Sequence, residues 1–364
     1  MKLINRKKSR GSKKLVRYAH IGYPKCASTA LQRGYFGPHR QLLHLGCGAE
    51  KNSEFWDDHG YATKQINQLL EVDLRYKTKY AYDVEEAKAA MQPYFDQAEA
   101  DDEIHAVGIS NENLCFNWHG GIDTSEKAER LFDIFGDKTE ILIVLRDQKS
   151  LIESLYKESV RFGYSGLFQD YLKYIWQYRD RSFFYDFMFE NVIRSYSELF
   201  GEDHVHVMFF EDLKEDSASF LKDISSNLGF DYYELPLDKE FNQQLSNEEL
   251  AVKRYMNEKY PHTFEMGVYH PADTHRYVPY LTNNCTEELG FEHYFDYHLR
   301  NGLCEIAKKV ARETQLPTLD LSWKGEYAET ILDAYNESNR ELHRLSGDSR
   351  YQKYGYTELN GKVD

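Results

Sequence analysis

The stretch YAHIGYPKCASTALQRGYF begins as a buried strand and ends as a helix. Its turn carries Gly22, Pro24, Lys25, Ser28 and Thr29. A helix that starts directly after a strand presents main-chain N–H groups without helical partners, and its dipole favours an anion there. The lysine adds a mobile positive charge, and the two hydroxyls can cap the helix or donate to an oxyanion. This combination predicts a site for a phosphate or sulfate ester.

Two other interpretations of this turn remain open on the motif alone. A Walker A loop needs GxxxxGK followed by Ser or Thr. Here Gly22 is followed after two residues by Lys25, and no glycine directly precedes the lysine, so the match is poor. The second alternative is a structural turn with a lysine at the surface.

A second anion site is predicted after the apolar run EILIVLR, which ends in Arg146. Ser154 follows eight residues later, about two turns along the next helix. An arginine at a strand end and a hydroxyl on the following helix can together hold a phosphate group. The alternative is that Arg146 pairs with a neighbouring acid such as Asp147.

A carboxylate follows a third apolar run, IHAVGIS, in the sequence NENL. Glu112 therefore lies just beyond a predicted strand end, where it could accept a proton from an acceptor hydroxyl. The alternative is an acid that caps a helix or lies in a loop.

Apolar runs of strand length alternate with segments of helical periodicity, such as those that begin at Val84, Gln148 and Ser217, along the first part of the chain. The runs cover 15–23, 104–110, 140–146 and 205–211. This alternation predicts βαβ units and an α/β fold with a central, mostly parallel sheet flanked by helices. In such sheets ligands bind beyond the carboxyl ends of the strands, where all three polar motifs lie.

From about Asn247 the strand signal fades and helical segments dominate. We therefore expect a flexible basic tail over 1–14 and a single domain over 15–364. Within that domain, 15–230 form the α/β core and 247–364 form a helical extension packed on it. The alternative for the basic tail is an arm that binds a surface.

Composition limits the classes of partner. The chain has 364 residues and a formal net charge of −15, which disfavours nucleic acid as a partner of the whole molecule. No run has the roughly 18 apolar residues of a membrane helix, and no apolar stretch follows the basic start as in a secretory signal. Five scattered cysteines without metal-ligand spacing indicate reduced thiols in a cytoplasmic protein and no metal site.

Taken together, the motifs resemble those of the sulfotransferases that use 3′-phosphoadenosine 5′-phosphosulfate (PAPS). GYPKCASTALQ is similar to the family's 5′-phosphosulfate loop, GxxKxGTTxL, and IVLRDQKSLIESLY looks like its 3′-phosphate motif. ISNENL resembles the S-x-E-x-L element of the carbohydrate branch, and FFEDL resembles a strand with an E-D-L ending. The resemblance covers roughly 15–230, and the order and spacing of the motifs are specific. It is closer to the carbohydrate and bacterial branch than to the cytosolic small-molecule enzymes.

The resemblance implies a P-loop-NTPase-like sulfotransferase fold and a role for each motif. Glu112 would be the base, and Lys25 would neutralise charge on the leaving phosphate. Arg146 and Ser154 would bind the 3′-phosphate. The product would be 3′-phosphoadenosine 5′-phosphate (PAP), with no metal required. The 5′-phosphate would be bound by Lys25, Cys26, Ala27, Ser28, Thr29 and Ala30.

The sequence departs from the family pattern at three points. Ala27 stands where the family usually has glycine, and Gln148 replaces a common proline. The RKGxxGxWK segment that closes over the nucleotide is not evident. His270 and Arg276 are the candidates to replace it.

The predicted reaction is sulfuryl transfer to a hydroxyl or amine, with a carbohydrate or related metabolite as the expected acceptor. The sequence selects no particular acceptor and does not indicate an oligomeric state. Two alternatives are an ATP-dependent kinase of the P-loop type and an inactive module that binds a carbohydrate or a protein.

Overall fold

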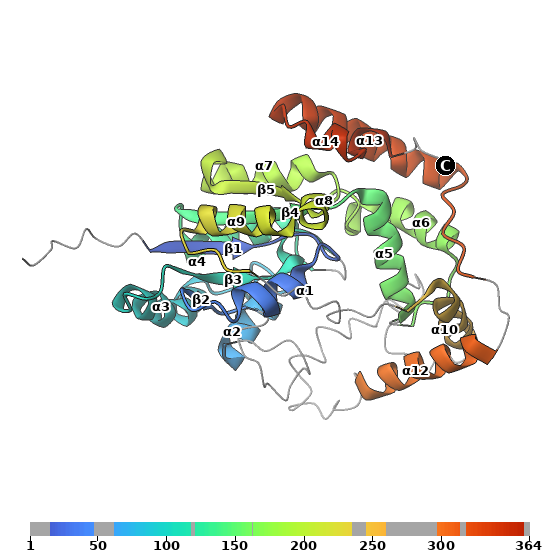
Figure 1. The fold of residues 1–364 in the computed structure, drawn as a ribbon, viewed down its shortest axis with the longest axis horizontal. Helices are drawn as coiled ribbons and strands as arrows, with labels where there is room; N and C mark the ends of the chain where they lie inside the picture. The colour runs from blue at the N-terminus through green and yellow to red at the C-terminus, as the bar shows by residue number, and fades with distance from the viewer. Residues whose placement is uncertain are drawn as a thin grey trace, which may run out of the picture.

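A single parallel sheet forms the centre of the molecule (Figure 1). The computed structural model describes residues 15–46, 62–117, 121–161, 163–234, 245–259, 297–313 and 318–359. The strands lie in the order β2-β3-β1-β4-β5, and every pair is parallel. Their bounds are β1 Val16–His20, β2 Leu42–His44, β3 Ala106–Ser110, β4 Thr139–Leu145 and β5 Val205–Phe209.

The predicted α/β fold with a mostly parallel sheet is therefore confirmed, and each of the four apolar runs overlaps a strand. β2 was not predicted, because three residues at the edge of the sheet leave too short a pattern to recognise. All residues of β3 are buried, and so is most of β4. Continuous burial of this kind is expected where helices cover both faces of a parallel sheet.

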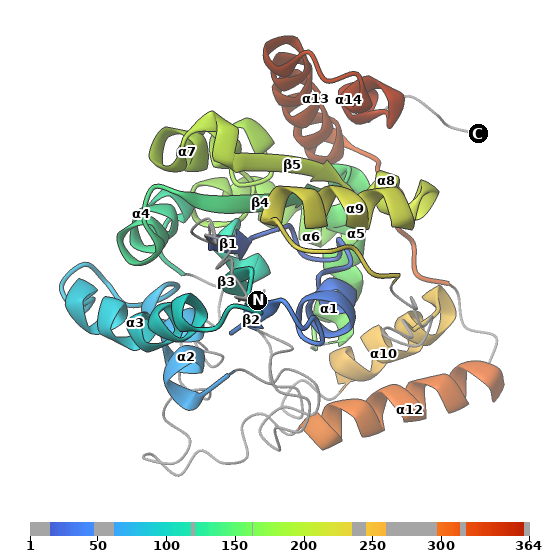
Figure 2. The same ribbon diagram turned by 60° about the vertical axis from the view of Figure 1, so that its left-hand side comes forward.

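Helices cover the sheet on both sides. On one face α9 packs against β1 and β4, and Figure 2 shows it in front of the strands. A second group of helices is formed by α3, α4 and α7. In this group α7 packs against β4 and β5, and α4 packs against α7 and α3. The longer helices are α3 Val84–Ala100, α4 Thr124–Phe135, α5 Gln148–Arg161, α6 Phe168–Gln177, α7 Phe189–Phe200, α9 Ser217–Leu228, α10 Asn247–Lys259, α12 Tyr297–Glu313 and α13 Glu326–Ser346.

Shorter helical elements lie between them. Two π-helical segments follow short α-helices directly, so that each pair forms one continuous helical stretch. The short elements are α1 Ser28–Ala30, η1 Leu31–Phe36, α2 Lys64–Gln68, η2 Leu69–Asp73, η3 Glu112–Leu114, η4 Arg179–Arg181, η5 Glu202–His204, α8 Phe210–Glu215, α14 Arg350–Lys353 and η7 Tyr356–Glu358. Within the described residues, no helix combines the length and apolar character that a bilayer span requires.

Helix α13 is joined to α5 by a buried pair of amides. Gln148, at the start of α5, donates to the side-chain oxygen of Asn339 at 2.8 Å, and Asn339 donates back to Gln148 at 2.9 Å. Both side chains are fully buried. Asn339 also donates to the carbonyl of Tyr356 at 2.9 Å. The glutamine that replaces the expected proline therefore anchors the C-terminal segment beside the predicted 3′-phosphate site.

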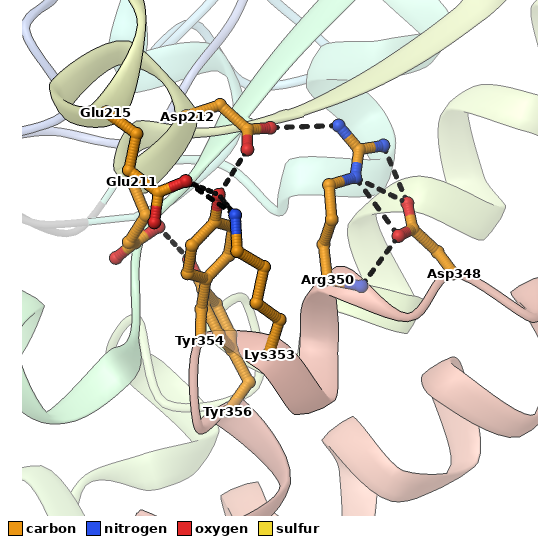
Figure 3. A network of polar contacts seen from close by, with 8 residues as sticks. All are labelled: Glu211, Asp212, Glu215, Asp348, Arg350, Lys353, Tyr354 and Tyr356. Atoms are coloured by element: carbon orange, nitrogen blue, oxygen red, sulfur yellow. Dashed lines mark hydrogen bonds and ion pairs between the residues drawn. The ribbon is translucent and has the colours of Figure 1, made fainter.

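A second connection joins the C-terminal segment to α8, the helix that follows β5 directly (Figure 3). The Arg350 guanidinium lies 3.0 Å from the carboxylate of Asp212. The buried hydroxyl of Tyr356 donates to Glu211 at 2.9 Å. The E-D-L ending of the sequence motif is thus used for packing against the C-terminal segment. The remaining contacts in Figure 3 include Lys353 with Glu215 and Tyr354 with Asp212.

Candidate active site

The turn after β1 runs beside β4 before it enters α1. The main-chain N–H groups of Ile21 and Tyr23 donate to the carbonyls of Leu142 and Val144 at 2.9 and 3.1 Å. Lys25 and Ala27 both have φ of 63°, in the left-handed region. Left-handed residues in such a turn can direct successive N–H groups toward one point, and this is how main-chain anion nests form. The geometry fits the anion site predicted from the sequence.

Ala27 is the helix N-cap residue, with φ 63° and ψ 21°. An L-residue with a Cβ atom is disfavoured in this conformation, and glycine is not. Ala27→Gly should therefore raise the free energy of unfolding by about 0.5–1 kcal/mol, net of the extra freedom of glycine in the unfolded chain. Chemical denaturation measures this change.

The matched control is Ala30→Gly, because Ala30 is a right-handed helical residue with φ −67°. Its replacement should lower stability by about 0.5–1 kcal/mol. If both substitutions destabilise the protein equally, the strain assigned to Ala27 does not exist.

Gly22 is required by a close approach beneath the turn. A Cβ atom on Gly22 would lie 2.8 Å from Nε2 of His20 and 3.0 Å from Cβ of Val144. His20 is held in place by a 2.7 Å hydrogen bond between its Nδ1 and the hydroxyl of Ser110. Burial, aided by the nearby His44, lowers the pKa of His20 to about 3, so the ring stays neutral. Gly22 of the turn therefore packs against the neutral, buried imidazole of His20.

Glu112 is the first residue of η3, which follows β3. β3 is the neighbour of β1 in the sheet, and the turn follows β1. The side chain of Asn111 caps η3 by accepting from the N–H of Asn113 at 3.0 Å, so the capping role is not filled by Glu112. Instead the carboxylate of Glu112 accepts a hydrogen bond from the hydroxyl of Ser28. The predicted base and the predicted anion loop are thus in direct contact.

The surroundings of Glu112 favour its protonated form. Burial raises the pKa of Glu112 above its usual range. The hydrogen bond from Ser28 and the positive charge of Lys25 act in the opposite direction. A carboxylate with a raised pKa is a stronger base at neutral pH, which suits proton abstraction.

Lys25 makes an ion pair that the sequence did not indicate. Its Nζ atom lies 3.1 Å from Oε2 of Glu158, near the end of α5. The same carboxylate lies 2.8 Å from Nη1 of Arg161. Although burial alone would raise it, these two cations hold the pKa of Glu158 down to about 2. Glu158 follows Ser154 by four residues, and only this helical spacing could have suggested it.

Arg146 reaches the turn from the end of β4. Its Nη1 donates to the carbonyl of Lys25 at 3.0 Å, and its guanidinium lies over the ring of Phe210 at 5.1 Å from the centroid. The carboxylate of Asp147 instead accepts from the N–H of Ser150 at 2.8 Å, in the first turn of α5. The Arg146 guanidinium thus lies against the main chain of the residue whose ammonium pairs with Glu158.

The other predicted site residues lie on the same elements. Ser154 is on α5, one helical turn before Glu158, and is 7% exposed. Thr29 and Ala30 are partly exposed residues of α1. The thiol of Cys26 is buried and donates to the carbonyl of Pro24 at 3.6 Å, and burial raises its pKa.

Direct contacts therefore link the predicted residues at the carboxyl ends of three neighbouring strands. β1 leads to Lys25 and Ser28, β3 to Glu112, and β4 to Arg146. His270 and Arg276 lie outside the described residues. Among the residues that the structure describes, no group of three or more His, Cys, Asp or Glu side chains is arranged to hold a metal ion.

Searches for similar proteins gave matches only among solved structures. No family model and no curated protein matches the chain. A sulfotransferase from Alicyclobacillus acidocaldarius is 18% identical, over 66% of this chain and 92% of that one, with a TM-score of 0.37. The sulfotransferase domain of the curacin biosynthetic pathway is 15% identical, over 63% and 77% of the two chains, with a TM-score of 0.37.

A mouse sulfotransferase, SULT7A1 complexed with PAP, is 12% identical, over 84% of this chain and 90% of that one, with a TM-score of 0.31. All three of these structures are named as sulfotransferases. At such low identities and TM-scores, the function proposed below rests on the residues of the site itself.

Proposed function

We propose that this protein is a sulfotransferase that moves a sulfuryl group from PAPS to an acceptor hydroxyl or amine. One observation carries the proposal: the cationic turn at Lys25 contacts Glu112 through Ser28 and Arg146 through its own main chain. A carboxylate base, a lysine ammonium and an arginine guanidinium thus lie together at the edge where parallel sheets bind ligands.

The donor set fits an adenosine nucleotide with separate phosphates at the 5′ and 3′ positions of its ribose. Lys25, the hydroxyl of Thr29 and the N–H groups from Cys26 to Ala30, including that of Ser28, would hold the 5′-phosphate. The single hydroxyl proton of Ser28 is donated to Glu112. Arg146 and Ser154 would hold the 3′-phosphate, which ATP lacks. When bound, PAPS supplies the sulfuryl group and a phosphate leaving group.

The residues around the donor would act by position and charge. Glu112 would take the proton from the acceptor hydroxyl onto its carboxylate. The ammonium of Lys25 would neutralise negative charge as it forms on the leaving phosphate oxygen, as cations do in phosphoryl transfer. Both actions need a preorganised site, and the hydrogen bond from Ser28 supplies it by fixing the carboxylate of Glu112 beside the turn.

We take a carbohydrate or related metabolite as the acceptor and the cytoplasm as the location. The acceptor rests on the S-x-E-x-L element, and the location on the free thiols of Cys26, Cys115 and Cys304. A mass-spectrometric screen of a cell extract supplied with PAPS tests the first. A product heavier by one sulfuryl group is expected with the wild-type protein and at a much lower level with Glu112→Gln.

The donor is tested by calorimetric titration with PAP and, separately, with ATP and Mg²⁺. PAP should bind tightly and ATP with Mg²⁺ weakly, because only PAP carries the 3′-phosphate. Binding of ATP with Mg²⁺ but not of PAP would favour a kinase. Binding of PAP without sulfate transfer to any acceptor would favour an inactive binding module.

Arg146→Ala should weaken PAP binding at least about tenfold, because a charge-assisted hydrogen bond to phosphate is lost. Arg17→Ala is the matched control. Arg17 also donates to a main-chain carbonyl, that of Phe135 at 3.0 Å, and lies over an aromatic ring, that of Phe95, but at the start of β1. Equal PAP affinity in the wild type and Arg146→Ala would remove Arg146 from the donor site.

A further inference from the structure

The predicted donor-binding lysine already has an anionic partner inside the protein. Lys25 pairs with Glu158 at 3.1 Å, and the side chains of the two residues are only 24% and 14% exposed. An ion pair shielded from water in this way interacts more strongly than one at the surface. An anion that binds to Lys25 must therefore compete with the carboxylate of Glu158 for the lysine ammonium.

Glu158 also stands next to the second predicted phosphate site. Residues four apart on a helix lie on the same face, so Glu158 and Ser154 share one face of α5. An anionic donor that uses both Lys25 and Ser154 would thus approach a fixed negative charge. A site evolved only to attract anions would not place a carboxylate there.

We propose that Glu158 is a positioning residue that holds Lys25 in the ligand-free site and competes with the donor phosphate for its ammonium. This inference rests on the proposed function, since it takes Lys25 as a ligand of the donor. The affinity for the nucleotide then depends on how strongly the donor phosphate binds Lys25 relative to the carboxylate of Glu158.

Arg161 sets the strength of this competition. It lies 2.8 Å from Glu158 and also interacts with the thiol of Cys304 on α12. By sharing the carboxylate, Arg161 weakens the hold of Glu158 on Lys25 and keeps Glu158 compensated when the lysine moves to the donor. The arginine therefore favours release of the lysine.

The first test is calorimetric titration of PAP into the wild type and Glu158→Gln. The substitution should tighten PAP binding by about tenfold, because a negative charge close to the anion site is removed. Glu158→Asp keeps the charge and should restore an affinity close to the wild type. A purely structural role for Glu158 predicts the opposite, a loss of affinity in Glu158→Gln.

The control for charge removal is Glu153→Gln. Glu153 lies on the same helix, but its carboxylate accepts from the indole of Trp323 at 2.8 Å instead of contacting the turn. This substitution should leave PAP affinity unchanged. An equal gain of affinity in Glu153→Gln would show a general charge effect and overturn the role of Glu158.

Arg161→Met gives an independent test with the opposite sign, and it serves equally if Glu158→Gln fails to fold. Without Arg161, Glu158 pairs with Lys25 alone, so PAP should bind about three- to tenfold more weakly. Unchanged or tighter binding in Arg161→Met would contradict the proposal. Absence of PAP binding in the wild type would refute the proposed function itself, whereas wild-type binding without these shifts would refute only the role of Glu158.

Discussion

Glu112→Gln should lower kcat by about 100-fold, the range expected when a general base is lost. The amide keeps the shape of the side chain and can still accept a hydrogen bond from Ser28, but it cannot take a proton. PAP affinity should not fall, because Glu112 acts on the acceptor and its replacement removes a negative charge beside the anion loop. Initial rates at saturating donor, together with PAP titration, measure the two effects.

The pH dependence of the wild type provides a second measurement. Since burial raises the pKa of Glu112, the carboxylate becomes protonated at a higher pH than an ordinary glutamate. The rate should therefore fall as the pH is lowered through this raised pKa, and Glu112→Gln should lack that acidic limb.

Although Glu112→Gln should lower kcat, it should not lower the stability of the protein at neutral pH. A carboxyl group whose pKa is raised on folding binds more protons in the native state, so its contribution to stability falls as the pH rises through that pKa. At neutral pH, removing this buried charge should leave Tm unchanged or higher. Wild-type turnover in a folded Glu112→Gln protein would exclude Glu112 as the base, and Glu153→Gln controls for loss of a carboxylate whose pKa is also raised.

Lys25→Ala should also lower kcat by about 100-fold, the effect of removing one group that stabilises transition-state charge. The loss should exceed any change in PAP affinity, because charge on the leaving phosphate develops during transfer. Glu112 should respond as well. Lys25 lowers its pKa, so the acidic limb of the rate profile should shift to higher pH in Lys25→Ala.

The control for Lys25→Ala is Lys88→Ala, which removes an exposed lysine paired with Glu85 on α3. Its turnover and pH profile should match the wild type. If Lys25→Ala retained full turnover and an unshifted acidic limb, Lys25 would be no more than a residue of a structural turn. That outcome would favour the alternative interpretation of the sequence, a structural turn with a lysine at the surface.

The sequence by itself determined the order of the elements and the ends at which chemistry could occur. Apolar runs of strand length and helical periodicity are local properties, and they predicted the four longer strands and the helices that begin at Val84, Gln148 and Ser217. The rule for parallel sheets then directed attention to Lys25 and Glu112 at strand ends. The three-residue β2 was missed because so short a strand carries almost no pattern.

Only the tertiary structure decided which side chains meet. Ser28 donates to Glu112 across 84 positions of the chain, and Arg146 donates to the carbonyl of Lys25 across 121. Gln148 bonds to Asn339 across 191 positions. The pairing of Lys25 with Glu158 depends equally on how the turn after β1 packs against α5. Periodicity reports which face of an element is apolar, but not which polar residue of another element lies opposite, because that depends on packing between segments far apart in the chain.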